Sequence, residues 1–162
     1  MPDGSSIAII GLSCRVPRAP SAAEFWHLLS SGRDAIEEMP EQRHALQSGR
    51  SIVRSVATPE SKPIGGWVEG IELFDAPFFG ISPREAAAID PQQRLMLELC
   101  WEAFEDAHVV PAGLVGSQTG VFVGAIANDY GDLAHEYGHE LITRHAVTGL
   151  RRGMIANRVS YT

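Results

Sequence analysis

Two histidines and a glutamate stand at the spacing of a zinc-protease helix, in the stretch HEYGH at residues 135–139. In that pattern His135 and His139 would hold zinc from successive helical turns, and Glu136 would activate a bound water. His145 lies where the longer version of the pattern has its third ligand. Ile142 stands where that version has the glycine that ends the helix, so a continuing helix would turn His145 away from the other two. We therefore favour a polar surface loop and assign no metal ligand, with a zinc hydrolase kept as an alternative.

The two cysteines are the other candidate reactive groups, but neither has the setting of a nucleophile. Cys100 falls on the apolar stripe of an expected helix, and Cys14 follows an expected strand with no histidine beside it in sequence. A free cysteine commonly packs as a small apolar side chain, which is how we interpret both. The turn after Gly11 lacks the G-x-G-x-x-G pattern of a dinucleotide site. The sequence thus yields no catalytic residue and predicts no resident cofactor.

Composition narrows the class of protein further. The 162 residues are 44% hydrophobic and carry a net charge of −7, which argues against nucleic acid or an anionic membrane as partner. The apolar run at residues 7–12 is too short for a signal peptide or a membrane span. Only two cysteines, far apart in sequence, indicate a reducing compartment. We expect a cytoplasmic protein without nucleic-acid or membrane partners.

Hydrophobic patterning predicts an α/β layer fold. The β-branched run at residues 7–11 and the run at 120–124 are typical of buried strands, and residues 67–79 predict a short strand followed by an irregular crossing. Residues 34–66, rich in proline and charge, predict a surface excursion. The strands are few for the number of helices, as expected if further polypeptide completes the sheet.

Three helix starts are marked by capping residues. Ser21 with Glu24 forms a capping box that opens a helix over residues 22–31, and Ser82 and Asp90 each precede a proline at a first helical position. The helix after Asp90 carries a stripe that we expect to be buried against a sheet. Its members are Leu95, Met96, Leu99, Cys100, Ala103, Phe104 and Ala107.

The stretches FFGISPREA at residues 78–86 and DPQQR at 90–94 resemble the ketosynthase (β-ketoacyl synthase) domain of modular type I polyketide synthases. The resemblance extends over nearly the whole chain, through IAIIG at residues 7–11, TGVFVG at 119–124 and ANRVSY at 156–161. The last of these resembles the segment shortly before the family's nucleophile. Residues 1–162 are thus identified as the N-terminal portion of a ketosynthase domain, with the cysteine nucleophile and two catalytic histidines beyond Thr162.

The resemblance implies a thiolase-like α-β-α-β-α sandwich, of which this chain supplies most of the first half. It implies a homodimer whose parent domain is an acyltransferase of the 3-oxoacyl synthase type. Its substrates would arrive on the phosphopantetheine of an acyl carrier protein. Further partners are the remainder of the ketosynthase domain and an adjoining acyltransferase domain. Ala125, Ile126 and Ala127 would lie near the acyl pocket.

Three questions stay open at this level. The resemblance fits a condensing enzyme and equally an initiating ketosynthase that carries glutamine at the nucleophile position and only decarboxylates. The chain could also be a non-catalytic piece that docks to a complementary chain. Arg151 and Arg152 stand where many synthases of this type have small polar residues, which leaves the subtype open.

Overall fold

The computed structural model describes residues 6–41, 43, 63–136 and 145–162. The chain divides into two compact units, one formed by Cys14–Gly70 and the other by Met1–Ser13 with Ile71–Thr162. In the described residues no helix has the length and apolar character needed to cross a membrane.

The smaller unit, residues 14–70, contains helix α1 (Ala22–Ser30) and strands β1 (Ile36–Glu38) and β2 (Ile64–Gly66). The predicted start of α1 is confirmed, because the Ser21 hydroxyl oxygen accepts a hydrogen bond from the Glu24 N–H at 3.3 Å. The same hydroxyl donates to the Glu24 carboxylate at 3.0 Å. The helix ends just before Gly32, whose φ of +63° gives the left-handed turn that closes many helices.

Strands β1 and β2 pair antiparallel at the two ends of the segment predicted as a surface excursion, with Ile36 opposite Gly66 and Glu38 opposite Ile64. The pairing is helped by Trp67, whose indole Nε1 donates to the Glu37 carbonyl at 3.1 Å. A strand starting at Trp67 was the wrong prediction, since β2 ends at Gly66 and irregular turns follow. Two glycines, poor strand formers in isolation, concealed the real strand.

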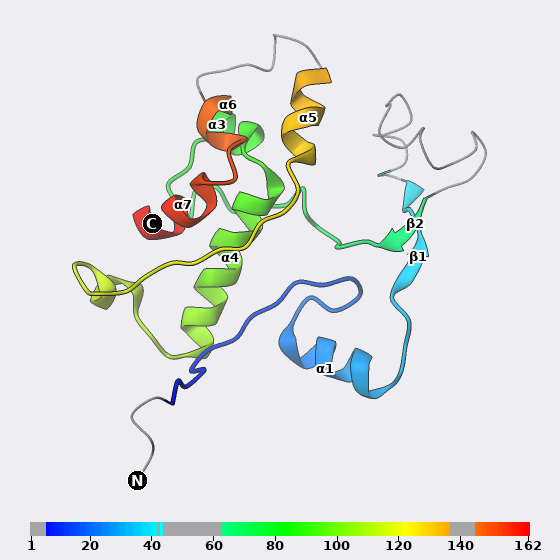
Figure 1. Ribbon diagram of the computed structural model, residues 1–162, viewed down its shortest axis with the longest axis horizontal. Coiled ribbons are helices and arrows are strands. Elements are labelled where there is room, and N and C mark those ends of the chain that lie inside the picture. The colour runs from blue at the N-terminus through cyan, green and yellow to red at the C-terminus, as the bar shows by residue number, and fades with distance from the viewer. Residues whose placement is uncertain (1–5, 42, 44–62, 137–144) are drawn as a thin grey trace. The chain divides into compact units, whose positions relative to one another are not determined.

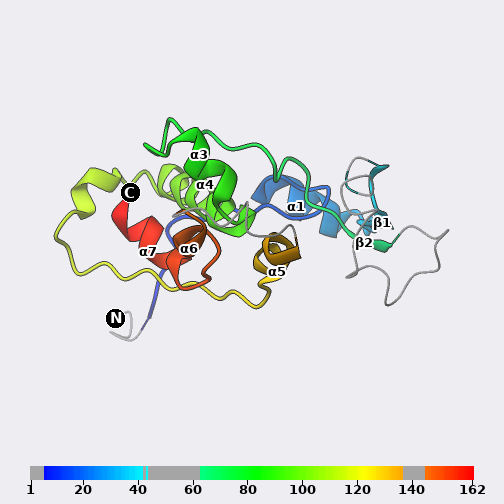
Figure 2. The same ribbon diagram turned by 90° about the horizontal axis from the view of Figure 1, so that it is seen from above.

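The larger unit is mainly helical in its described residues. Its elements are α3 (Pro83–Ala88), α4 (Pro91–Asp106), the short 3-10 helix η2 (Pro111–Leu114), α5 (Asp129–Glu136), α6 (Ala146–Gly149) and α7 (Met154–Tyr161). Helix α7 packs against α4 (Figure 2), and α6 packs against α3. Both predicted caps are confirmed: Ser82 accepts from the Glu85 N–H at 3.3 Å, and Asp90 accepts from the Gln92 N–H at 2.8 Å.

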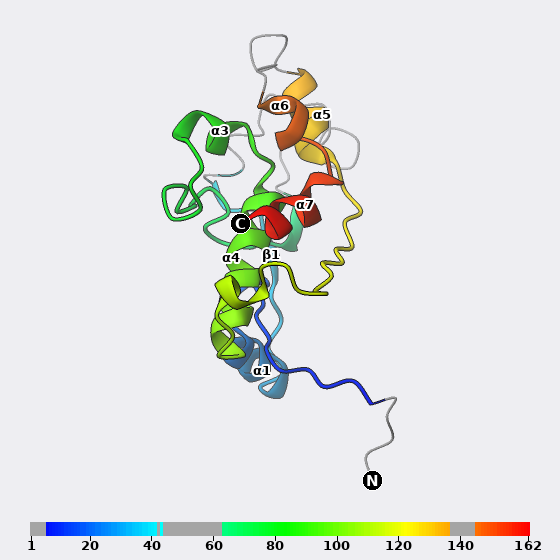
Figure 3. The same cartoon turned by 90° about the vertical axis from the view of Figure 1, so that its left-hand side faces the viewer.

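Residues 7–11 and 120–124, predicted as buried strands, are not strands in the structure. Residues 119–128 run without regular structure between η2 and α5 (Figure 3). The side chains of Ile9 and Phe122 are 87% and 95% exposed. A strand exists only where a neighbouring strand takes up its backbone hydrogen bonds, and within the described residues neither segment has one. The β-branched pattern indicates a preference for extended backbone, which becomes a strand only when a neighbouring strand pairs with it.

Residues 11–13 run along α4 instead. The Leu12 N–H donates to the Asp106 carboxylate at 2.9 Å, and the Ser13 hydroxyl donates to the Leu99 carbonyl at 2.7 Å. Gly11 lies so close to the helix that a Cβ atom on it would be 2.2 Å from the Ala103 carbonyl oxygen. Glycine is therefore required by this contact.

The buried face of α4 differs from the predicted stripe. All seven predicted residues are only half-buried, whereas Gln93 and Leu97 are buried. These two lie one helical turn apart on a face that meets α7, so a helix rather than a sheet covers it. On another part of α4 the ring of Trp101 meets Phe78 edge to face at 4.7 Å, which anchors the irregular crossing before α3.

Candidate functional site

The DPQQR stretch forms the first turn of α4, and its Gln93 holds three backbone carbonyls of a distant segment. The Gln93 side chain is 1% exposed. Its amide nitrogen donates to the carbonyl oxygens of Gly149 at 2.8 Å, Thr148 at 3.1 Å and Arg151 at 3.2 Å. The last carbonyls of a helix have no partner within it, so Gln93 satisfies groups that the short helix α6 leaves open.

Arg158 on α7 contacts the same glutamine from the other side. Its Nε donates to Gln93 Oε1 at 2.6 Å, and its Nη1 donates to Glu85 Oε1 on α3 at 2.9 Å. The Arg158 side chain is only 12% exposed, so this ion pair is better shielded from water than a surface pair. Side chains of α3, α4 and α7 are thereby joined, and we call Glu85, Gln93 and Arg158 the α7 anchor.

Asp90 caps α4 beside this anchor and is 4% exposed. Burial raises the pKa of its carboxyl, and the backbone hydrogen bond from Gln92 works in the opposite direction. The Asp90 N–H donates to the Gly149 carbonyl at 2.9 Å. The motif therefore fixes both the start of α4 and the end of α6.

Gly149 permits the close contact between α6 and the end of α3. A Cβ atom there would lie 2.3 Å from the Ala88 carbonyl oxygen and 3.2 Å from the Ile89 Cα. Both are backbone atoms that cannot move aside without displacing the helix end. The site thus requires a residue without a side chain at position 149.

Residues 125–127, predicted to lie near an acyl pocket, follow the extended stretch before α5. Ala125 is half-buried, and the Ile126 side chain is 94% exposed. Two side chains from elsewhere in the unit hold this backbone: Arg152 Nη1 donates to the Ile126 carbonyl at 2.5 Å, and Gln92 Nε2 donates to the Ala127 carbonyl at 3.4 Å. The pocket role of these residues stays a prediction.

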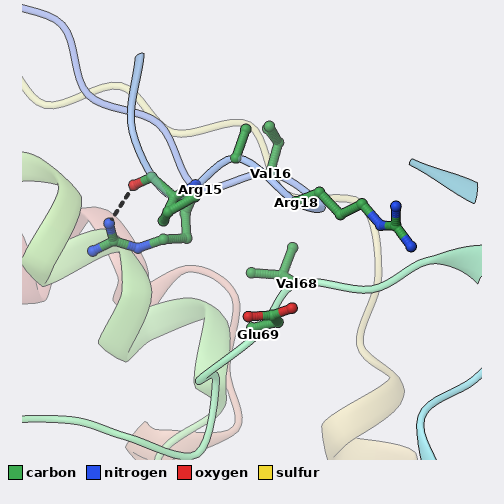
Figure 4. Close-up of a pocket in the computed structure, with 7 residues that line it drawn as sticks. Arg15, Val16, Arg18, Val68 and Glu69 are labelled. Carbon is green, nitrogen blue, oxygen red and sulfur yellow. Dashed lines mark hydrogen bonds between the residues drawn. The ribbon is translucent and has the colours of Figure 1, made fainter. Parts of the chain in front are cut away.

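A small cavity in the other unit is a poor candidate for a substrate site (Figure 4). Its volume is about 40 Å³, enough for a few water molecules and too small for an acyl chain. Arg15 at its edge donates from Nη1 to the Pro20 carbonyl at 2.6 Å. The lining residues are Arg15, Val16, Arg18, Ala19, Pro20, Val68 and Glu69.

The zinc pattern receives no support. His139 and Ile142 lie outside the described residues, and α5 ends at Glu136. Among the residues that the structure does describe, no group of three or more histidine, cysteine, aspartate or glutamate side chains could hold a metal ion. No relative described below is a zinc hydrolase.

The two cysteines, interpreted from the sequence as packing residues, are less buried than that interpretation expects. Cys14 and Cys100 are half-buried and form no disulfide. Burial raises the pKa of the Cys100 thiol, which lowers the fraction of reactive thiolate at neutral pH.

Comparison with known proteins identifies the class. Residues 4–162 match the profile of the family "Beta-ketoacyl synthase, N-terminal domain". The chain is 48% identical over 157 residues to the polyketide synthase GfsA of Streptomyces halstedii, covering 96% of this chain and 2% of that protein. It also resembles a solved oxazolomycin ketosynthase domain from Streptomyces albus, with a TM-score of 0.74, 34% identity, and coverage of 94% of this chain and 27% of the other. A ketosynthase of the bacillaene synthase from Bacillus subtilis gives a TM-score of 0.74 at 32% identity, with coverage of 95% and 24%.

The chain belongs to the β-ketoacyl synthase family and corresponds to the N-terminal domain of that family. Its relatives are ketosynthases of polyketide synthases, which confirms the thiolase-like fold class and the polyketide-synthase resemblance. It spans about a quarter of the solved ketosynthase chains that it matches and a few per cent of the synthase.

Sequence reasoning found the DPQQR motif but not the role of its second glutamine. Gln93 and Arg158 are 65 positions apart, and nothing in their types shows that they pair. A glutamine one helical turn before Leu97 was the available signal, because an amide that becomes buried must find partners.

Proposed function

We propose that this chain is the N-terminal part of a condensing ketosynthase, which takes an acyl chain from an acyl carrier protein and extends it with a malonyl-type unit. The observation that carries the proposal is the 48% identity to a polyketide synthase across 96% of the chain. The TM-score of 0.74 to a ketosynthase domain supports it independently.

The proposed reaction has two steps. A cysteine thiolate located after residue 162 attacks the thioester of the carrier-bound acyl chain, and the carrier thiol leaves. A malonyl-type thioester then loses CO₂, the resulting enolate carbon attacks the acyl-cysteine carbonyl, and the cysteine thiolate is released as the carbon–carbon bond forms. Two histidines, also after residue 162, would stabilise the developing charge on the thioester oxygens. No resident cofactor is needed for this chemistry.

The residues of this chain would serve by position rather than by direct chemistry. Helix α7 ends at Tyr161, shortly before the proposed nucleophile, and the α7 anchor fixes where that helix lies. Ala125, Ile126 and Ala127 would form part of the acyl pocket once the rest of the ketosynthase domain packs over them. We further propose a cytoplasmic homodimer that works with an adjoining acyltransferase domain.

Mass spectrometry of the complete ketosynthase domain tests the proposal. After incubation with an acyl thioester, the domain should gain one acyl mass on a cysteine after residue 162. An initiating ketosynthase with glutamine at that position would gain none while still releasing CO₂ from a malonyl thioester. A domain that neither gains the mass nor releases CO₂ would contradict both functions.

The pocket assignment has its own test in the variant Ile126→Trp. If Ile126 lines the pocket, the larger indole shortens it, and loading of long acyl chains falls more than loading of acetyl. One methylene in an apolar pocket changes selectivity by roughly 10- to 200-fold, so the effect is measurable. Equal rates for all chain lengths would remove Ile126 from the pocket.

A further inference from the structure

Arg152 holds the backbone of the segment that contains the proposed pocket residues. Its Nη1 donates to the Ile126 carbonyl at 2.5 Å, across 26 positions of sequence. A hydrogen bond donated by a charged guanidinium is stronger than one between neutral groups. No strand pairs with residues 125–127 in the described part of the chain. Hydrogen bonds from side chains therefore position this backbone.

A second side chain secures the next carbonyl. Gln92 Nε2 donates to the Ala127 carbonyl at 3.4 Å and to the Asp90 carboxylate at 3.3 Å. The side chain that holds Ala127 is therefore itself held by the residue that caps α4. Adjacent carbonyls are thus held from two directions, by α4 and by the turn before α7. The Ile126 side chain, 94% exposed, takes its direction from that backbone.

The neighbouring arginine provides a contrast. Arg151 is also exposed, but it enters the network through its backbone carbonyl, which accepts from Gln93 at 3.2 Å. Its guanidinium makes no hydrogen bond to a described residue. Variants of Arg151 and Arg152 can therefore separate the effect of losing a positive charge from the effect of losing the contact with Ile126.

We propose that Arg152 is a positioning residue that sets acyl-chain selectivity through the backbone of Ile126. The inference rests on the proposed function, because it requires residues 125–127 to face the acyl chain. Loss of the contact leaves the Ile126 carbonyl to water, and the pocket wall shifts with it.

Selectivity of the complete ketosynthase domain is the first measurement. We compare kcat/KM for loading from acetyl and hexanoyl thioesters of a small thiol, in Arg152→Gln, Arg152→Lys and Arg151→Gln. In Arg152→Gln the ratio of the two values should change about fivefold or more, since small shifts in a pocket wall act on long chains most. Arg152→Lys should restore part of the wild-type ratio, and Arg151→Gln should keep it.

A ratio within twofold of wild type in Arg152→Gln would overturn the inference, even if both rates fall together. An equal change in Arg151→Gln would overturn it as well, because charge alone would then explain the effect.

Amide hydrogen exchange at residues 125–128 gives a readout that does not depend on activity. Exchange there should speed up in Arg152→Gln and not in Arg151→Gln. Unchanged exchange in Arg152→Gln would refute the positioning role. Faster exchange in Arg152→Gln, combined with a wild-type domain that loads no acyl chain, would instead confirm the contact and reject the proposed function, so the two failures are distinguishable.

Discussion

The guanidinium of Arg158 and the side-chain amide of Gln93 form a hydrogen bond of 2.6 Å between Nε and Oε1. The amide nitrogen of the same glutamine donates to three carbonyls at residues 148, 149 and 151. Only a side chain with both a carbonyl and an NH₂ group can do both. Gln93 therefore links α7 to the segment around α6, and the stability of the complete ketosynthase domain should depend on this link.

Replacing Gln93 should destabilise the domain. Gln93→Ala leaves buried carbonyls and the Arg158 Nε without their partner, at about 1–3 kcal/mol for an unsatisfied buried group plus a cavity. We expect the free energy of unfolding in urea to fall by about 2–4 kcal/mol. Gln118→Ala, at an exposed position, is the matched control. A decrease in the free energy of unfolding below about 0.5 kcal/mol, the usual range of surface substitutions, would show that the α7 anchor does not stabilise the domain.

A methyl group at position 149 should also be costly. Gly149→Ala places Cβ 2.3 Å from the Ala88 carbonyl oxygen, so α6 must move away from α3. Overpacking of this kind typically costs about 1–3 kcal/mol. Gly153→Ala is the control, because a Cβ there meets nothing within 4 Å. Thermal unfolding that ranks the two variants equally would contradict the close contact.

The buried carboxyl of Asp90 gives a pH dependence. Burial raises its pKa above the usual 3.8, so the folded state keeps this proton at pH values where the unfolded state has lost it. Between the two pKa values, stability falls as pH rises, and it is then constant. Asp90→Asn keeps the capping oxygen without the charge, so its stability relative to wild type should increase between about pH 4 and pH 7.

Asp132→Asn, at an exposed position on α5, is the control for this pH series and should lack that increase. If Asp90→Asn is less stable than wild type by the same amount at both pH values, the aspartate acts through its hydrogen bonds alone.

A polypeptide of residues 1–162 should be a poor folding unit by itself. Ile7, Ile9, Phe122 and Ile126 are each at least 87% exposed, and exposed apolar side chains in number cause association. We expect a broad thermal transition, binding of a hydrophobic dye, and aggregation that depends on concentration. The complete ketosynthase domain should show a sharp transition under the same conditions. A cooperative, monomeric melt of residues 1–162 would mean that these side chains need no covering.

Sequence predicted what is local and missed what depends on distant partners. The helix starts at Ser21, Ser82 and Asp90 could be predicted because each cap is a contact within three residues. The strands expected at residues 7–11 and 120–124 depend on pairing, which no pattern within five residues can supply. The sheet that does form joins Ile36 to Gly66, and its glycines give no strand signal.

The candidate site shows the same division. Residues 125–127 were identified through resemblance, but the hydrogen bond from Arg152 to Ile126 joins two segments whose meeting depends on the path of α5 and α6. The same resemblance leads one to expect a small polar residue at the position of Arg152. Its partner became visible only in three dimensions.

Condensation by the complete ketosynthase domain tests the central claim most directly. The domain, loaded with an acyl chain, is mixed with malonyl acyl carrier protein, and the carrier-bound product is analysed by mass spectrometry. The account predicts a 3-oxoacyl group on the carrier protein and one CO₂ for each new carbon–carbon bond. Release of CO₂ with only a decarboxylated two-carbon unit left on the carrier protein would contradict it.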